Sequence, residues 1–113
     1  MKKIYLFCSA GMSTSMLASN MQDVANAHNL PIEVLAFPIG KMAEIVQELH
    51  PDCILLGPQV KFTYEDIEKE YGGEQGLPIG VIGVSEYGMM DGEKVLKSAI
   101  HLMKQKKLQM KER

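Results

Sequence analysis

The stretch that decides the fold of this chain reads Ile4-Tyr5-Leu6-Phe7-Cys8-Ser9-Ala10-Gly11-Met12-Ser13-Thr14-Ser15. A run of apolar and aromatic residues ends on Cys8, and small residues, a glycine and hydroxyl side chains follow. This order predicts a buried strand that opens through a tight loop into the start of a helix. Such a loop gathers backbone N–H groups, and the helix dipole makes them attractive to an anion. Because the same field favours a thiolate, Cys8 is a candidate nucleophile beside a bound phosphate.

The order of strand and then helix repeats along the rest of the chain. We expect strands at residues 3–8, 32–37, 52–56 and 78–84, and helices at residues 14–28, 42–49, 61–71 and 92–108. Alternation of this kind predicts an α/β fold with a parallel sheet and helices on both faces. Right-handed crossovers favour the flavodoxin-like strand order 2-1-3-4. We therefore expect one four-stranded domain over residues 1–113, with Ser13 or Thr14 capping the first helix and Lys104–Arg113 as a frayed tail.

This strand order places a predicted site at one edge of the sheet. Strands 1 and 3 are neighbours, and the winding reverses between them, which is where open α/β sheets bind ligands. The loop after Cys8, the turn at residues 57–59 and the loop at residues 85–88 meet at that edge. Gln59 and Tyr87 are therefore predicted at the rim, where they contact phosphate or a partner. Structural roles, as a turn amide and a half-buried aromatic ring, fit them equally well.

The loop itself is predicted to bind phosphate through backbone and hydroxyl donors. Its members are Ser9, Ala10, Gly11, Met12, Ser13, Thr14 and Ser15. Hydroxyl residues also serve as turn and cap residues. The two roles are compatible, because a helix cap and an anion site use the same unbonded N–H groups.

The second cysteine, Cys53, gives a contrast within the same sequence. It lies near the start of the third strand and is followed by an apolar run, so we expect inert packing. Both cysteines are expected as thiols, because a reducing cytosol disfavours their single possible disulfide. The three histidines are far apart and have no metal-ligand spacing with either cysteine. We assign no metal and no cofactor.

Composition limits the classes of function. The chain has 113 residues, of which 46% are hydrophobic and 23% charged, as in ordinary globular domains. Its net charge of −2 gives no electrostatic case for nucleic acid or an anionic membrane. The apolar run from Ile4 ends at Ser9, short of a signal peptide, and no later stretch approaches the length of a membrane span. We expect a cytoplasmic protein without direct membrane insertion.

The residue six positions after Cys8 separates two kinds of phosphate chemistry. Low-molecular-weight tyrosine phosphatases have an arginine there, which neutralises charge in the transition state, whereas this chain has Thr14. The missing arginine favours a phosphoryl carrier over a hydrolase. Two alternatives remain open: a thiol phosphatase or arsenate-reductase-like enzyme, and a flavodoxin-like module that binds a mononucleotide.

Three segments of the chain resemble those of one family. Residues 7–15, 55–60 and 87–92 closely resemble recurrent segments of the enzyme IIB component of the sugar phosphotransferase system, lactose/cellobiose (chitobiose) type. The resemblance extends over essentially the whole chain. It implies a phosphocysteine at Cys8, formed from a phosphohistidine on enzyme IIA. It also implies transfer of the phosphoryl group to a sugar bound by the membrane permease, enzyme IIC, during uptake.

The resemblance leaves the sugar open, because in this system the permease binds it. A separate chain of this length favours the β-glucoside, cellobiose or chitobiose group over lactose. The resemblance further implies a cytoplasmic protein that associates peripherally with the permease. Methionines near the predicted site fit either core packing or a soft surface for these partners, namely Met12, Met16, Met89 and Met90.

Overall fold

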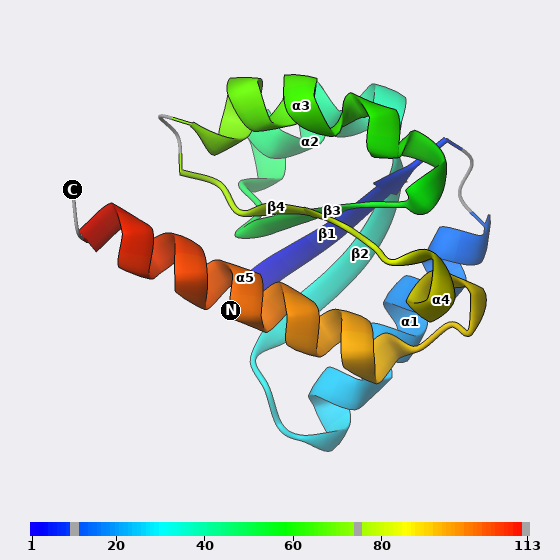
Figure 1. Cartoon of the computed structure of the whole chain (residues 1–113). Coiled ribbons are helices and arrows are strands. Elements are labelled where there is room, and N and C mark those ends of the chain that lie inside the picture. Colours follow the sequence, from blue (N-terminus) through cyan, green and yellow to red (C-terminus); the bar gives the residue numbers. More distant parts are fainter. Residues whose placement is uncertain (10–11, 74–75, 112–113) are drawn as a thin grey trace.

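The computed structural model of this chain describes residues 1–9, 12–73 and 76–111. Four parallel strands form one sheet in the order β2-β1-β3-β4, as Figure 1 shows. Their bounds are β1 (Lys2–Cys8), β2 (Ile32–Pro38), β3 (Cys53–Leu56) and β4 (Ile79–Val81). The predicted α/β fold with its flavodoxin-like strand order is confirmed.

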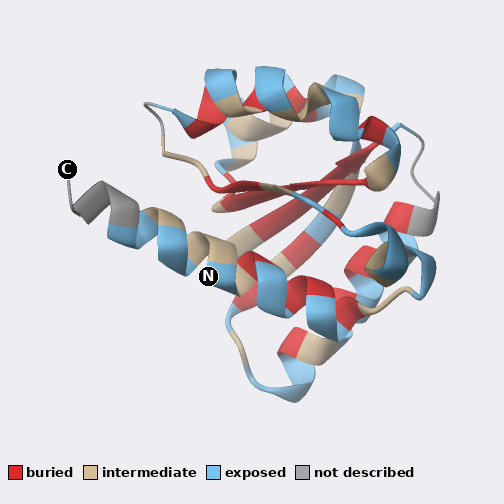
Figure 2. Ribbon diagram, in the orientation of Figure 1, coloured by how far each residue is buried: buried red, intermediate tan, exposed pale blue. Residues whose placement is uncertain are grey.

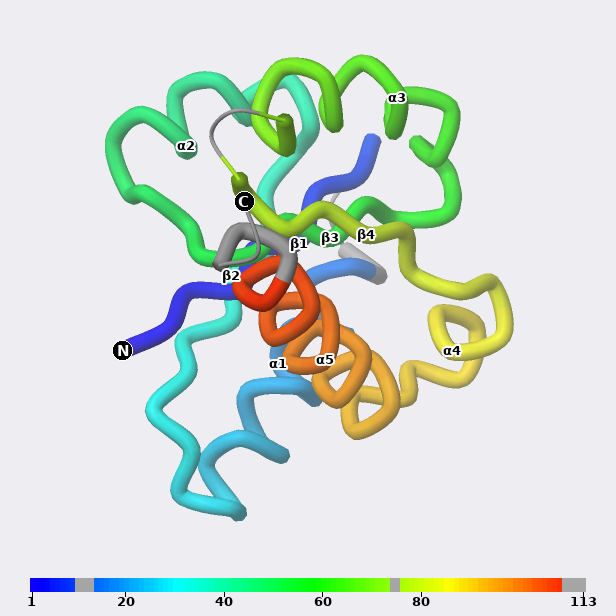
Figure 3. The backbone as a smooth tube through the Cα atoms, turned by 60° about the vertical axis from the view of Figure 1, so that its left-hand side comes forward, coloured from blue at the N-terminus to red at the C-terminus, as the bar shows by residue number. Residues whose placement is uncertain are grey.

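Helices cover both faces of this sheet. α1 (Met12–Ala27) and α5 (Gly92–Lys111) lie side by side on one face, as Figures 1 and 3 show. The other face carries α2 (Met42–Leu49) and α3 (Tyr64–Ile67). Shorter helical segments complete the chain: the 3-10 turns η1 (Ile39–Lys41) and η2 (Pro58–Thr63), the π turn η3 (Glu68–Gly72) and α4 (Val84–Gly88).

Alternate residues of β1 build two apolar cores. Ile4 and Leu6 belong to the core between the sheet and α1 with α5, whereas Tyr5 and Phe7 belong to the core under α2 and α3. This division follows from the strand, because successive side chains point to opposite faces. Figure 2 shows the buried strands between the two helical layers. Position 8 continues the Ile4 and Leu6 face, so Cys8 lies on the α1 side of the central strand.

Hydrogen bonds at the start of β1 fix its register against β3. The Lys3 backbone N–H donates to Asp52 Oδ2 at 2.7 Å, and the Asp52 N–H donates to the Lys3 carbonyl at 2.8 Å. Ile4 therefore pairs with Cys53, and Phe7 pairs with Leu56. Cys8 then extends one residue beyond the paired region, level with the turn that follows β3.

Two elements near the predicted site differ from their expected bounds. α1 begins at Met12, so Ser13 and Thr14 lie inside its first turn, and a cap at either of them is wrong. β4 covers only Ile79–Val81 instead of residues 78–84, because Val84 starts α4, a helix that sequence analysis missed. Glycine at position 80 lets β4 approach α5 closely, since a Cβ there would lie 2.9 Å from a methyl group of Leu102.

The last helix is longer than expected. α5 continues to Lys111, so the frayed tail from Lys104 is wrong over the described residues, and residues 112–113 lie outside them. The Lys106 ammonium forms an ion pair with Glu68 Oε1 at 3.7 Å, which joins α5 to the opposite helical layer. The helix expected at residues 61–71 consists of the successive segments η2, α3 and η3. Within the described ranges, no helix is both long and apolar enough to cross a membrane.

Candidate active site

Cys8 is the last residue of β1 and is only 1% exposed. The turn after β3 lies directly beside it, because the Gly57 N–H donates to the Phe7 carbonyl at 2.8 Å. A Cβ at position 57 would lie 3.2 Å from Cys8 Cβ, which is closer than side chains normally approach. Glycine at this position therefore leaves room for the cysteine at the carboxyl edge of the sheet.

Gln59 folds back over the same turn. Its side-chain Oε1 would lie 2.7 Å from a Cβ at Gly57, so the amide and Cys8 flank one backbone position. The Gln59 residue is exposed, and it belongs to η2, which begins directly after the turn. The structure thus places an amide that can donate and accept hydrogen bonds next to the cysteine.

Thr14 and Tyr87 form a hydrogen bond that joins α1 to α4. Thr14 is completely buried, and its Oγ1 lies 3.1 Å from the Tyr87 hydroxyl, either of which can donate. Tyr87 itself is half-buried against the core of the α1 face. Sequence analysis missed this pair, although a hydroxyl one turn before Leu17 on the apolar side of α1 was an available signal. The Thr14 side chain is therefore held by Tyr87 within the first turn of α1.

The remaining predicted loop residues are described unevenly. Ser9 and Ser15 are exposed on either side of the loop. Ala10 and Gly11 lie outside the described residues, and Met12 and Ser13 are described only as the first helical residues of α1. The first turn of α1 contains no acidic residue, so no carboxylate there competes with an anion for the N-terminal N–H groups.

Cys53 has the environment expected of an inert core residue. Burial, with a smaller contribution from the Asp52 carboxylate, raises the pKa of Cys53 to about 12. The thiol at this position is therefore protonated at neutral pH and is a poor nucleophile. Neither Cys53 nor Cys8 takes part in a disulfide. Among the described residues there is no group of His, Cys, Asp or Glu side chains that could hold a metal ion.

Segments that leave the Cys8 edge of the sheet carry exposed apolar side chains. They come from segments that follow β1, β3 and β4, namely Met16 (60% exposed), Phe62 (80%), Val84 (71%) and Met89 (77%). The methionines were expected either in the core or on a surface for partners. Met16 and Met89 are on the surface, whereas Met90 is partly buried against the core. The side chain of Met12 lies outside the described residues. Phe62 was not singled out from the sequence, because η2 has no regular hydrophobic period. We call these four exposed residues the apolar ring.

The fold and the site together define a class of protein. It is a flavodoxin-like domain with a cysteine at the topological switch point, below the N-terminus of a helix. The sequence model of the family described as "PTS system, Lactose/Cellobiose specific IIB subunit" matches residues 3–98. The chain therefore belongs to this family, and the resemblance found in the sequence is confirmed.

Individual relatives support the same assignment. The galactose-specific EIIB component of Lactococcus lactis subsp. cremoris and the cellobiose-specific EIIB component of Lactococcus lactis subsp. lactis are each 42% identical over 105 residues, which cover 90% of this chain and 96% of the relative. The solution structure of a cellobiose-specific phosphotransferase IIB component from Borrelia burgdorferi is 37% identical and has a TM-score of 0.74 over 93% of this chain and 94% of that chain. The chain is a phosphoryl-carrying phosphotransferase of a sugar uptake system, rather than a phosphatase or a mononucleotide-binding module.

Proposed function

We propose that Cys8 is the residue that carries the phosphoryl group. Enzyme IIA supplies it from a phosphohistidine, and a sugar bound by the permease, enzyme IIC, receives it. The observation that carries this proposal is the position of Cys8 at the carboxyl edge of the sheet beside the first turn of α1. The other thiol, Cys53, is buried at the start of β3 with a raised pKa.

The proposed reaction has two displacements at phosphorus. The Cys8 thiolate attacks the phosphohistidine, so that an S–P bond forms, the N–P bond breaks and the imidazole leaves. A sugar hydroxyl then attacks the phosphocysteine, its O–P bond forms, the S–P bond breaks and the hydroxyl proton passes to a base. Covalent capture divides one difficult transfer into two easier ones. Positioning and charge stabilisation then carry most of the catalysis.

The loop from Ser9 to Ser15 is proposed to hold the phosphoryl oxygens through backbone N–H groups and through the hydroxyls of its serines. Thr14 is proposed to contribute its N–H, because its side chain is completely buried against Tyr87. Tyr87 is then a positioning residue that fixes the first turn of α1. Gln59 is proposed to contact a phosphoryl oxygen directly, and the position of its amide at the same turn as Cys8 supports this role.

The partners are proposed to dock on the apolar ring. The four exposed apolar side chains belong to segments that leave this edge, and together they would offer a surface on which a partner excludes water from the transfer. The protein would act as one cytoplasmic domain that associates with the membrane through enzyme IIC alone, without nucleic acid or cofactor. The sugar is proposed to be of the β-glucoside, cellobiose or chitobiose kind. Relatives named for galactose and for cellobiose are equally similar to this chain, which supports specificity that lies in the permease.

Intact-mass measurement tests the proposal. The chain is incubated with phosphoenolpyruvate, the general phosphotransferase proteins and a cognate enzyme IIA. We expect one added phosphoryl group, which is absent in Cys8→Ser and retained in Cys53→Ala. Alanine at position 53 removes the thiol without burying a new hydroxyl. A Cys8→Ser protein that still gains the phosphoryl group would refute the assignment.

A further inference from the structure

A second concave region lies at the edge of the sheet opposite Cys8. α5 runs against the strand direction, and its C-terminal half passes beyond the edge where the strands begin, as Figure 1 shows. Two open hollows of about 410 and 430 Å³ lie beside this half of the helix. Both are lined by Lys2, Met103 and Lys107. Volumes of this size are typical of small-molecule sites.

The hollow of about 410 Å³ combines an apolar floor with a basic rim. We call its apolar lining residues the floor, namely Leu30, Pro31, Ile32, Ile100 and Met103, and its basic lining residues the rim, namely Lys2, Lys104 and Lys107. These three lysines form no ion pair with any residue that the structure describes. Within the described part of the chain, no acidic side chain lines this hollow. Among the described residues, the hollow therefore joins apolar surface to three lysines that form no ion pair.

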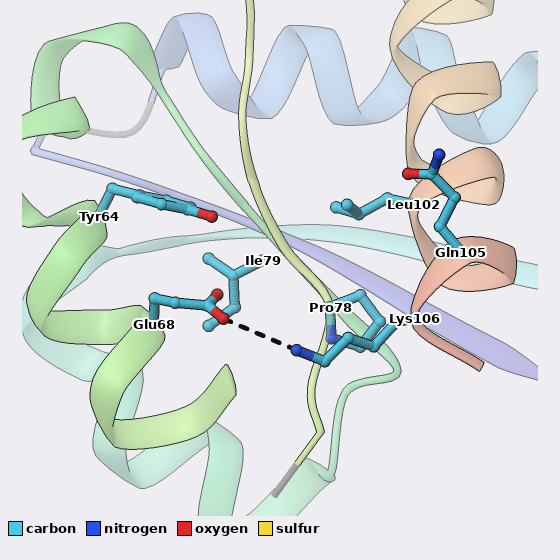
Figure 4. Close-up of a pocket in the computed structure, with 7 residues that line it drawn as sticks. All are labelled: Tyr64, Glu68, Pro78, Ile79, Leu102, Gln105 and Lys106. Atoms are coloured by element: carbon cyan, nitrogen blue, oxygen red, sulfur yellow. Dashed lines mark ion pairs between the residues drawn. The ribbon is translucent and has the colours of Figure 1, made fainter. Parts of the chain in front are cut away.

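The neighbouring cavities differ in charge. A cavity of about 180 Å³ beside β4, shown in Figure 4, also has a lysine, Lys106, but Glu68 lies 3.7 Å from its ammonium. The hollow of about 430 Å³ includes Asp52, whose carboxylate accepts the Lys3 N–H. An acid thus accompanies the lysines in both of these places. The two larger hollows share Lys2 and Lys107, and the hollow between β2 and α5 differs from its neighbour in that its described lining residues include Lys104 and no acidic side chain.

We propose that this hollow binds an amphiphilic anion, an acyl or aryl group with a carboxylate or similar head, taken as a monomer from solution. The apolar group lies against the floor, where removal of apolar surface from water supplies most of the affinity. The head is held by the ammonium groups of Lys104 and Lys107, whose aliphatic stems extend the apolar surface. The attraction is local, because the whole chain carries a net charge of −2. Since the hollow and Cys8 lie at opposite edges of the sheet, this site works independently of phosphoryl transfer.

Decanoate, below its micelle-forming concentration, is a suitable probe for the full-length, isotope-labelled chain. Amide resonances are followed by nuclear magnetic resonance during the titration. We expect saturable shifts confined to residues 30–32 and 100–107. Decyltrimethylammonium has the same chain length but a positive head, and it should bind at least tenfold more weakly. Equal binding of the two probes, or shifts centred elsewhere, would overturn the proposal.

Matched variants locate the head group. Lys104→Gln with Lys107→Gln should weaken decanoate binding about tenfold, because each exposed ion pair contributes modestly. Lys69→Gln with Lys94→Gln removes the same charge from exposed positions outside the hollow and should leave the affinity unchanged. Unaltered affinity in the first pair would contradict the site.

Two further experiments distinguish decanoate binding at this site from phosphoryl transfer at Cys8 and from adsorption to a membrane surface. Cys8→Ser should bind decanoate as tightly as the wild type, so that failure of the phosphoryl assignment and failure of this site are distinguishable. Phosphatidylglycerol vesicles should not sediment the protein if the ligand is a monomer from solution. Lysine-dependent sedimentation without saturable decanoate binding would mean a membrane surface and would overturn the proposal.

Discussion

Cys8 and Cys53 lie on neighbouring strands, both on the side of the sheet that faces α1, and both are almost completely buried. Cys53 is the first residue of β3, pairs with Ile4, and is surrounded by core residues. Cys8 is the last residue of β1, beside a glycine turn and the first turn of α1. Burial therefore does not separate the cysteine that we propose as the phosphoryl carrier from the one that we expect to be inert. What separates the two cysteines is whether the segments that follow the strand lie beside the thiol.

The largest expected effect on the rate of phosphoryl transfer comes from a substitution in the turn beside Cys8. In Gly57→Ala the new Cβ meets Gln59 Oε1 at 2.7 Å and Cys8 Cβ at 3.2 Å, so both groups must move. Misplacement of reacting groups by about 1 Å can cost about 100-fold in rate. Cys8 has to give by only a few tenths of an ångström, so we expect phosphoryl transfer from enzyme IIA, measured by rapid quench, to slow by about tenfold.

Gly40→Ala is the matched control, because a Cβ at position 40 meets nothing within 4 Å. Its transfer rate and thermal unfolding should equal those of the wild type. If Gly57→Ala transfers as fast as Gly40→Ala, the turn does not position the cysteine.

The apolar ring tests the same edge from outside. Phe62 is 80% exposed, so Phe62→Ser should leave the free energy of unfolding within about 0.5 kcal/mol of the wild type. Its affinity for phosphorylated enzyme IIA, measured by calorimetry, should fall about tenfold if the ring is the docking surface. Leu108→Ser changes an exposed residue at the opposite end of the molecule and should not alter this affinity. Equal losses in both variants would exclude the ring.

The Thr14–Tyr87 hydrogen bond predicts a smaller effect. Tyr87→Phe leaves the buried Thr14 hydroxyl without its partner and should reduce the free energy of unfolding by about 1 kcal/mol. Adding Thr14→Val removes the other hydroxyl, so the double variant should lose less than the sum of the two single variants. Urea denaturation of all four proteins measures this coupling. Strict additivity would show that the bond contributes nothing.

The raised pKa of Cys53 predicts a loss of stability that occurs in alkali and not at neutral pH. Its pKa is raised from 9.0 to about 12, so the folded state keeps a proton that the unfolded chain releases. The resulting stability is complete below pH 9 and is lost as the pH rises toward 12. The melting temperature should therefore fall in alkali, and the fall should be shallower in Cys53→Ala. Tyr5, whose pKa burial and Glu33 raise to about 12, adds to the slope in both proteins. Identical slopes would contradict the assigned environment of Cys53.

Much of the fold followed from local sequence patterns. The apolar runs ending at Cys8, Phe37 and Leu56, and the periodic helices between them, were sufficient for the sheet order, because crossover handedness leaves few alternatives. α4 was missed because Val84 continues the apolar run of β4, so the hydrophobic pattern does not mark where the strand ends. The expected frayed tail was wrong over the described residues, where α5 continues to Lys111 and Lys106 pairs with Glu68, a partner 38 positions away that no local pattern reveals.

Part of the candidate site was predictable from the strand order. Strand order alone brought Gln59 and the turn after β3 to Cys8, since those segments follow neighbouring strands. The bond between Thr14 and Tyr87 and the exposure of Phe62 depend on how α4 and η2 pack. Such tertiary contacts are not encoded in the spacing of residue types, so sequence reasoning left the role of Tyr87 open.

The most direct test of the account follows the phosphoryl group from one edge of the sheet to its acceptor. The chain is phosphorylated with labelled phosphoenolpyruvate through enzyme IIA and then purified. One portion is digested to locate the label. The other portion is added as intact protein to membrane vesicles that contain the cognate enzyme IIC and sugar. We predict that the label lies on the peptide containing Cys8 and then appears in sugar phosphate at the rate at which it leaves the protein. Label on the peptide containing Cys53, or release as inorganic phosphate without sugar phosphate, would contradict the account.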